Sequence, residues 1–414
     1  NKKNLAIVTA DGGGDDCNGT IWIKKGHILK QVYKTNICNI GRIYRYVTLI
    51  LGMKPTEHEF KVMGLAGYGL KNTKYYDYTN KVFAETLDCK GINFFYKKKP
   101  KDLYFYFRNK LQNQRFDAIA YSIQKFTEDI LYKWFLNINS KYKVNNFIFS
   151  GGVAQNIKAT KKILENKNIK SIFVPPGPGD ESLCIGAAYC LIAEKNNEKS
   201  KKISTIIPPY TGTSYSKKDL EFIKNDKKVK IKNSSPKEVA KILKKGFPVA
   251  IFSLSKSEFG PRALGNRSII ARPDDAMILH TINKFIKVRD FWMPFAPSIL
   301  AERFNKYIVQ TKDIDPIFMT HSCDTTAEGK KSLVAATHPF DRTARPQKVY
   351  KSLNQNYYNI IREFEKISGI GAVLNTSFNL HGEPIVESPQ DAIRTLKNSG
   401  LKYLYIGNYL VSKK

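Results

Sequence analysis

The chain has 414 residues, of which 42% are hydrophobic and 25% charged, a balance typical of folded proteins that argues against intrinsic disorder. A length of 414 residues exceeds what one hydrophobic core usually supports, so we expect two domains. No apolar run reaches the roughly 18 residues that a membrane-spanning helix needs, and no basic-then-apolar leader opens the chain, so we expect a cytoplasmic protein with no membrane partner.

The net charge is +32, from 68 Lys and Arg against 36 Asp and Glu. Such a surplus is compatible with nucleic acid, a membrane surface or anionic substrates. However, 55 of the 68 cations are lysines, mostly dispersed singly or in pairs, so we interpret most of the surplus as solvated surface and do not expect a nucleic-acid partner. Seven of the 13 arginines fall between Arg262 and Arg345, and the planar guanidinium suits phosphate or carboxylate. This cluster indicates an anion site, with structural ion pairs as the alternative.

The first half of the chain begins with two predicted strands, at residues 4–9 and 20–24, joined by a glycine-rich turn at 11–16. Helices are predicted around 42–51 and 116–138. The second helix has apolar residues at helical spacing, a face that should pack on a sheet. These are Phe116, Ile119, Ile123, Phe126, Ile130 and Trp134.

Two further segments repeat one pattern, a short buried strand followed by a glycine-rich loop and a helix. The strands are at 146–150 and 171–174, and their loops are Ser-Gly-Gly (150–152) and PPGPGD (175–180). Such units predict a parallel α/β layer with its loops gathered at the carboxyl ends of the strands, where nucleotides bind in open α/β folds.

Four residues in these loops are candidates for ligand binding. Gly151 and Gly152 would let a phosphate approach the backbone, and Asn156 could hydrogen-bond a ribose or base. Tight strand–helix packing would explain the glycines equally well. Asp180 could hold a cation, but it is also well placed as the N-cap of a helix beginning at residue 181.

The second half begins after a polar linker at 195–202 and predicts another α/β unit over 205–414, with a helix at 236–245 and strands at 248–254 and 372–375. It holds the densest motifs, in which cations stand among glycine, proline and aromatic residues. The cations are Arg262, Arg267, Lys287 and Arg289. Aromatic walls lower the local dielectric and strengthen a cation's hold on phosphate.

Nucleophilic catalysis finds no support in the sequence. The six cysteines form no Cys-x-x-Cys pair and are expected to be reduced thiols. We expect structural roles for the histidines His58, His321, His338 and His381, because no pair has metal-ligand spacing.

Seven blocks, in the same order along the chain, resemble the signatures of the carbamoyltransferases of the nodulation-protein and antibiotic-tailoring type. They are EFKVMGLAGYG (59–69), SGGVAQN (150–156), PPGPGDESLCIGAA (175–188), GPRALGNRSI (260–269), KVRDFWMPFAPSIL (287–300), DRTARPQ (341–347) and NTSFNLHGEPIVESPQDAI (375–393). The blocks cover essentially the whole chain.

The resemblance implies an α/β protein in which the C-terminal part of an actin-like domain (1–200) is followed by a YrdC-like domain (201–414). The YrdC-like domain would form carbamoyl-adenylate from carbamoyl phosphate and ATP. The actin-like domain would hold a divalent metal, iron or magnesium, and pass the carbamoyl group to a hydroxyl of a small molecule or glycan. A homodimer is one assembly that stays open.

The resemblance also assigns roles to residues. Asp180 and Asp11 would bind the metal, and Gly151, Gly152 and Asn156 would bind the nucleotide. Cations would act on carbamoyl phosphate and the ATP phosphates, namely Arg262, Lys287, Arg289 and Arg345, with Arg267, Ser377 and Asn379 beside them.

One feature departs from the family pattern, because the family's His-x-x-x-His metal pair is absent. We therefore interpret the chain as a fragment without its natural N-terminus and with an incomplete metal site. Two alternatives remain, a tRNA threonylcarbamoyl-transferring enzyme, for which the charge would be an RNA footprint, and a non-catalytic nucleotide- or RNA-binding module. The blocks at 260–268 and 287–298 favour O-carbamoyl transfer.

Overall fold

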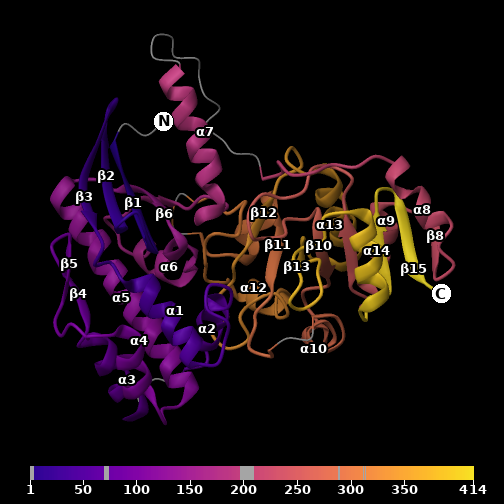
Figure 1. Ribbon diagram of the computed structural model, residues 1–414. Coiled ribbons are helices and arrows are strands. Elements are labelled where there is room, and N and C mark those ends of the chain that lie inside the picture. The colour runs from indigo at the N-terminus through magenta and orange to yellow at the C-terminus, as the bar shows by residue number, and fades with distance from the viewer. Residues whose placement is uncertain (1–3, 70–73, 196–208, 288–289, 311, 313) are drawn as a thin grey trace. The chain divides into compact units, whose positions relative to one another are not determined.

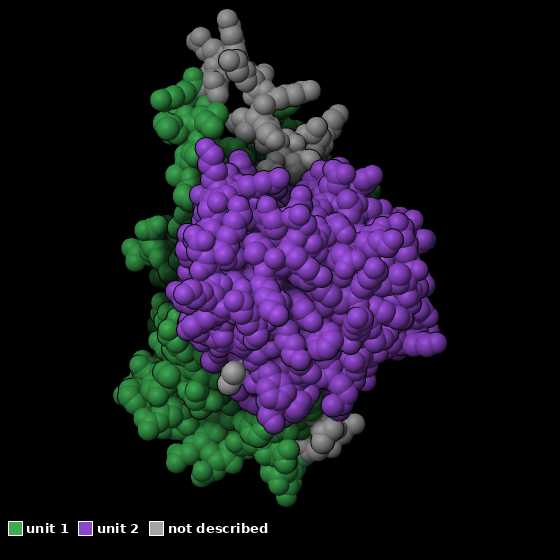
Figure 2. All heavy atoms as spheres, turned by 90° about the vertical axis from the view of Figure 1, so that its right-hand side faces the viewer, with its two compact units in different colours: residues 1–197, 311–314, 320–322 green, residues 198–310, 315–319, 323–414 purple. Residues whose placement is uncertain are grey.

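The computed structural model describes residues 4–69, 74–195, 209–287, 290–310, 312 and 314–414. The chain divides into two compact units, coloured separately in Figure 2. Unit 1 is Asn1–Asn197 with Thr311–Ile314 and Thr320–Ser322, and unit 2 is Glu198–Gln310 with Asp315–Met319 and Cys323–Lys414. Each unit has its own sheet and helices, which confirms the α/β class.

Unit 1 is built on a five-stranded sheet of order β3-β2-β1-β6-β7. Figure 1 labels β1, β2, β3 and β6 of this sheet. Its strands are β1 (Asn4–Gly14), β2 (Cys17–Lys25), β3 (Ile28–Thr35), β6 (Asn146–Ser150) and β7 (Ser171–Phe173). The first three form an antiparallel meander, whereas β1, β6 and β7 are parallel. Alternate side chains of β1 lie in the core, as the period of a strand requires.

The β1–β2 hairpin differs from the sequence prediction. The strand does not end before the glycines but continues through Gly14, with an irregularity in register between Ala10 and Gly14. The turn is made instead by Asp15 and Asp16, whose φ angles are 50° and 53°. Aspartate tolerates the left-handed region because its short polar side chain can bond locally, so these residues make a tight hairpin turn without glycine.

The helices of unit 1 pack around the long helix α5 (Phe116–Tyr142), which contacts α2, α3 and α6. The predicted apolar face is buried from Ile119 through Trp134, but Phe116 is 57% exposed and does not join it. The indole N–H of Trp134 donates to the carbonyl of Ile92 at 3.0 Å. The remaining elements are α1 (Ile40–Ile50), α2 (Glu59–Ala66), α3 (Lys74–Ala84), β4 (Leu87–Lys90), β5 (Asn93–Tyr96), α4 (Leu103–Leu111), α6 (Ile157–Leu164) and α7 (Leu183–Lys195).

Unit 2 is built on an eight-stranded mixed sheet of order β12-β11-β13-β10-β9-β14-β15-β8. The strands are β8 (Val229–Asn233), β9 (Val249–Phe252), β10 (Arg267–Ala271), β11 (Ala296–Leu300), β12 (Gln347–Val349), β13 (Ala372–Ser377), β14 (Tyr403–Ile406) and β15 (Tyr409–Lys413). All residues of β9, β10 and β11 are buried, so these strands form the centre of the unit's core.

The helices of unit 2 are α8 (Glu221–Lys224), α9 (Pro236–Lys244), α10 (Met277–Thr281), α11 (Phe304–Tyr307), α12 (Ala327–Ser332), α13 (Gln355–Ser368) and α14 (Pro389–Asn398). Helices α9 and α13 pack against each other. A π-helical turn, Ile282–Lys287, follows α10. Such turns are rare and often mark functional positions.

Three sequence expectations concern the chain as a whole. The six cysteines are all free thiols. Within the described residues, no helix is both long and apolar enough to cross a membrane. Two histidines are held by local backbone, since His338 accepts N–H groups of residues 340 and 341 and His58 accepts that of residue 54.

His321 should make unit 1 sensitive to acid. The ring is 4% exposed, its Nε2 lies 3.1 Å from the carbonyl oxygen of Ile172, and burial lowers the pKa of its imidazole. The folded state therefore binds fewer protons than the unfolded state below pH ~6.5, and stability should fall as pH decreases, by at most about 1.4 kcal/mol per pH unit. Urea unfolding between pH 5 and 7.5 would measure this slope, and His321→Gln should flatten it. An equal slope in both proteins would contradict the prediction.

Candidate functional site

The carboxyl ends of three parallel strands meet at one edge of the unit 1 sheet. Asp11 lies near the end of β1, Gly151 directly follows β6, and the loop 175–180 follows β7. The Gly151 N–H donates to the carbonyl of Pro178 at 2.7 Å, and the Gly152 N–H donates to Oδ2 of Asp11 at 2.7 Å. The three segments predicted to carry a ligand site therefore meet.

These bonds limit what the glycine loop can offer a phosphate. Both glycine N–H groups already donate to protein oxygens, so they are not free donors in this structure. Gly151 has φ 90°, and a Cβ there would lie 2.1 Å from the carbonyl oxygen of Ala10. Close packing between β6 and β1 thus explains Gly151.

Gly151→Ala and Gly152→Ala form a matched pair of substitutions. A Cβ at Gly152 would lie 3.6 Å from the Asp11 carboxylate, an ordinary contact. We expect Gly151→Ala to destabilise unit 1 by about 3 kcal/mol, from positive-φ strain and overlap with backbone, and Gly152→Ala by less than about 1 kcal/mol. Chemical denaturation of both variants would measure the difference. Equal effects would contradict the packing explanation.

Asn156 is engaged within the protein. Its Oδ1 accepts the N–H of Ala159 at 3.0 Å, which makes it the N-cap of α6. Its amide also exchanges two hydrogen bonds of 2.9 Å with Gln124, which accepts a bond from the Tyr44 hydroxyl as well. The described contacts thus give Asn156 a positioning role at the start of α6.

Asp180 is not the N-cap that the sequence predicted, because it is the first residue of the turn itself. Gly179 is the N-cap of a short 3₁₀ turn, Asp180–Ser182, and the Asp180 carboxylate is exposed. Because the turn begins one residue early, the carboxylate is not used for capping.

The metal hypothesis needs more ligands than this edge supplies. Asp11 already accepts the N–H groups of Gly12 and Gly152, and among the described residues no three His, Cys, Asp or Glu side chains come together as a metal site. Asp11 and Asp180 provide two carboxylates at most, fewer than a structural or catalytic ion normally takes from a protein. The described residues alone do not fit a resident metal.

In unit 2, the loop 260–267 wraps around one carboxylate. Oε1 of Glu258 accepts the backbone N–H groups of Leu264, Asn266 and Arg267 at 2.7, 2.8 and 3.0 Å. Three charge-assisted bonds to one oxygen fix the backbone of this loop. Glu258 lies two residues before the signature block 260–269, and only the structure assigns it this role.

A buried polar network lies under the same loop. Nδ2 of Asn375 donates to the carbonyl of Ala263 at 3.0 Å, and Nε2 of Gln347 donates to that of Leu264 at 2.9 Å. The Ser298 hydroxyl donates to Gln347 at 2.7 Å and accepts from Asn375 at 3.0 Å. Three signature blocks distant in sequence therefore support one loop. Sequence reasoning did not single out these residues, although a polar side chain inside a buried strand is a usable signal.

Lys287, Ser377 and Asn379 come together at the ends of the π turn and of β13. The Lys287 ammonium donates to Oγ of Ser377 at 3.1 Å and to the carbonyl of Asn379 at 3.2 Å, and it also contacts the Ser377 carbonyl and Asn379 Oδ1. Lys287 is only 4% exposed, and these four oxygens are uncharged. These contacts fix the position of the ammonium before any substrate binds, as preorganised electrostatic stabilisation requires.

The arginines predicted to bind phosphate differ in how well the structure describes their burial and their partners. Arg262 is partly buried, burial lowers the pKa of its guanidinium to about 10, and it forms no ion pair within the described residues. Arg345 is also partly buried, two residues before β12. Arg289 lies outside the described residues.

Arg267 is in the core of unit 2, where its Nε and Nη2 are buried without a hydrogen-bond partner. It is 1% exposed, its Nη1 donates to the carbonyls of Ser253 and Asn266 at 2.7 and 3.0 Å, and its guanidinium lies 3.7 Å from the ring centroid of Phe252. The burial of β10 accounts for this, since Arg267 is the first residue of that strand. It therefore supports the loop 260–267 from beneath.

Comparison with known proteins identifies the class. The family described as "Carbamoyltransferase N-terminus" matches residues 1–189, and "Carbamoyltransferase C-terminus" matches residues 240–413. The chain belongs to the carbamoyltransferase family, a family of transferase enzymes.

Individual relatives extend over nearly the whole chain. The uncharacterized protein MJ1051 of Methanocaldococcus jannaschii is 35% identical over 99% of this chain and 80% of its own length. The nodulation protein NolNO of Sinorhizobium fredii is 30% identical over 99% of this chain and 61% of its own length. Among solved structures, full-length HypF in its phosphate- and nucleotide-bound form covers 45% of this chain and 22% of its own, at 19% identity and a TM-score of 0.29, too low to establish a shared fold.

Proposed function

We propose that the protein is an O-carbamoyltransferase that forms carbamoyl-adenylate from carbamoyl phosphate and ATP and transfers the carbamoyl group to a hydroxyl of a small molecule or glycan. The family assignment and the likeness to nodulation proteins support this proposal. The structural observation that supports it most is that two candidate cations belong to one unit. Lys287 is held by Ser377 and Asn379. Arg262 is partly buried and has no ion pair among the described residues.

Unit 2 would be the YrdC-like, adenylate-forming part. Carbamoyl phosphate would first be hydrolysed to carbamate and inorganic phosphate, and a carbamate oxygen would then attack the α-phosphorus of ATP and displace pyrophosphate. Carbamate itself is a weak electrophile, and its linkage to AMP supplies a good leaving group. Negative charge builds on the phosphoryl oxygens as that bond forms, and cations that are already desolvated stabilise this charge without reorganising. We assign this role to Arg262 and Lys287, and extend it to Arg289 and Arg345 on the family resemblance.

Unit 1 would be the actin-like part that carries out transfer. The edge of its sheet at which β1, β6 and β7 end would receive the adenylate beside the loop 150–156. Asn156 would hold the start of α6 in place. Because the glycine N–H groups are already bonded, we expect phosphate contacts to come from side chains. On the family resemblance we keep Asp11 and Asp180 as proposed ligands of a divalent metal, which would need further ligands beyond the described residues.

Pyrophosphate release tests the proposed reaction. The purified chain would be incubated with ATP, magnesium and carbamoyl phosphate, and we expect release that depends on carbamoyl phosphate and is lost in Lys287→Met. Threonine with bicarbonate in place of carbamoyl phosphate should give no release. Release with threonine and bicarbonate alone would contradict O-carbamoyl transfer and favour the threonylcarbamoyl reaction.

A further inference from the structure

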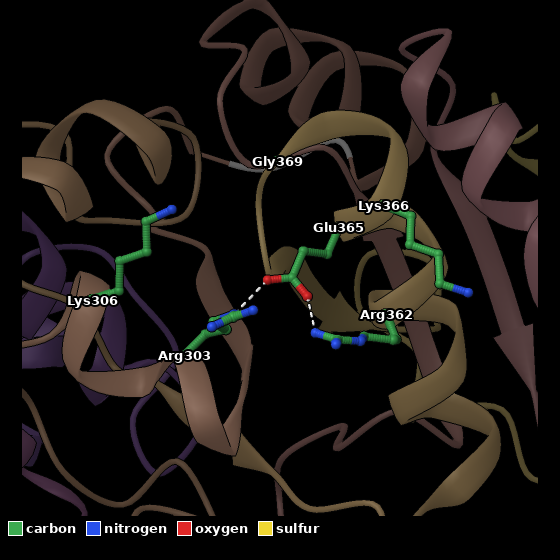
Figure 3. Close-up of a pocket in the computed structure, with 6 residues that line it drawn as sticks. All are labelled: Arg303, Lys306, Arg362, Glu365, Lys366 and Gly369. Carbon is green, nitrogen blue, oxygen red and sulfur yellow. Dashed lines mark hydrogen bonds and ion pairs between the residues drawn. The ribbon is translucent and has the colours of Figure 1, made fainter.

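A cationic pocket lies on unit 2 beside the C-terminal half of α13. Its volume is about 470 Å³, and it is lined by Arg303, Lys306, Arg362, Glu365, Lys366 and Gly369 (Figure 3). Four of these six residues are cations and one is an acid. A cavity of this size accommodates a small ligand.

Glu365 orients two of the cations. Its Oε1 accepts a hydrogen bond from Nε of Arg303 at 2.6 Å, and its Oε2 pairs with Nη1 of Arg362, as the dashed lines in Figure 3 show. The Glu365 side chain is 14% exposed, whereas those of Arg303 and Arg362 are 43% and 41% exposed. A guanidinium has five N–H donors, so each arginine is held by one bond and keeps others for a ligand. Glu365 is therefore a positioning residue for both arginines.

Two glycines allow this arrangement. Gly369, at φ 78°, ends α13 in the left-handed conformation, and its N–H donates to the carbonyl of Glu365 at 2.8 Å. At Gly371, a Cβ would lie 2.8 Å from Cγ of Arg303 and 3.0 Å from Oε1 of Glu365. The backbone at this position thus leaves room for the Arg303–Glu365 pair.

The neighbouring acids do not neutralise the pocket completely. Lys366 pairs with Glu363, and Arg362 lies 4.0 Å from Glu302. Lys306 has no carboxylate partner among the described residues, and its ammonium lies 5.3 Å from the ring centroid of Tyr307. Counting four cations against Glu365, Glu363 and Glu302 still leaves a positive balance.

The pocket is distinct from the Lys287 cluster. Strands β11 and β13 are antiparallel neighbours, with Ile299 opposite Ala372 and Ala296 opposite Asn375. Arg303 and the pocket glycines lie at the end of this pair where β11 finishes and β13 begins, whereas Ser377 is the last residue of β13. Five residue steps along β13 separate the two ends by about 17 Å.

We propose that this pocket binds a compact polyanion with two or more phosphate groups, of the kind represented by inorganic pyrophosphate or tripolyphosphate. Two guanidinium groups oriented by one carboxylate suit bidentate contact with phosphate oxygens, and Lys306, which has no carboxylate partner among the described residues, adds charge beside them. The six lining residues include no aromatic or large apolar side chain, so the pocket recognises charge and not a nucleobase.

Calorimetric titration of the full chain with inorganic pyrophosphate, without magnesium, tests the proposal. The key variant is Arg303→Gln/Lys306→Gln. Its matched control is Lys330→Gln/Lys331→Gln, which also removes two positive charges, but from exposed positions of α12 in the same unit. Both are made in an Arg262→Gln background, so that binding at the proposed reaction site is weakened in every sample. Circular dichroism and thermal melting establish that each variant is folded.

We expect saturable binding in the Arg262→Gln background, weakened at least about tenfold by the pocket double substitution and less than about twofold by the control. If the double variant does not fold, Lys306→Gln alone should weaken binding about threefold, because this side chain takes part in no ion pair within the described residues. The absence of saturable binding, or equal weakening in both double variants, would overturn the proposal. With wild-type Arg262, the pocket variant should retain pyrophosphate release from ATP and carbamoyl phosphate, so the pocket and the proposed reaction can fail independently.

Discussion

Replacing Arg262 with glutamine should lower carbamoyl-phosphate-dependent pyrophosphate release by about 10²–10³-fold. Burial already lowers the pKa of this guanidinium, and no carboxylate partner among the described residues offsets its desolvation. Because no protein carboxylate neutralises it, the positive charge of Arg262 can act on the phosphoryl oxygens of the substrate. Steady-state kinetics should place the loss in kcat/KM, with the thermal midpoint unchanged or slightly raised.

Arg272→Gln is the matched control for this substitution. Arg272 lies in the same unit, but its Nε and Nη2 bond both oxygens of Asp274 at 2.9 and 2.7 Å. Its charge is therefore already neutralised, and we expect kcat/KM to change less than about threefold. Equal losses in the two variants would mean that Arg262 contributes only to the overall field of the unit, contrary to the prediction.

Gly265→Ala should destabilise unit 2 by about 4 kcal/mol. Gly265 has φ 113°, and a Cβ there would lie 2.2 Å from Cδ1 of Tyr357, a ring that is 1% exposed. The loop 260–267 is held by its three bonds to Glu258, and the Tyr357 ring is buried, so backbone strain and overlap add. Urea unfolding followed by Trp fluorescence would measure the loss.

Gly246→Ala separates the two causes. Gly246 has φ 85°, but a Cβ there would meet no atom within 4 Å. This variant should therefore show only the conformational strain, about 1–2 kcal/mol. If Gly265→Ala lowers the free energy of unfolding no more than Gly246→Ala does, the contact with Tyr357 does not constrain the signature loop.

The elements that the sequence predicted well are those with a strong local pattern. The strand at residues 146–150 is found at those bounds, and the helix at 116–138 is extended only to Tyr142. Phe116 continues the apolar spacing of that helix but is exposed, because periodicity does not show where the neighbouring elements end. The turn predicted at 11–16 contains Asp15 and Asp16, which make it, but the strand before it was predicted to end at residue 9 and continues to Gly14, because glycine is more typical of turns than of strands.

The candidate site shows a similar division. Lys287, Ser377 and Asn379 were grouped from separate motifs, and the structure brings them into contact. Arg267 belongs to the same set of cations, yet it lies in the core, because nothing in a motif distinguishes a cation facing a ligand from one beneath a loop. The bonds from Glu258, Gln347 and Asn375 to the loop depend on three-dimensional proximity and could not be derived from spacing.

We propose that this chain joins a carbamoyl group to AMP. Mass spectrometry of a rapidly quenched reaction containing ATP, magnesium and ¹³C-carbamoyl phosphate tests it most directly. We predict an adenylate that carries the ¹³C label, accompanied by pyrophosphate and absent in Lys287→Met. The appearance of ADP and inorganic phosphate without a labelled adenylate, from a folded and concentrated sample, would contradict the proposed reaction.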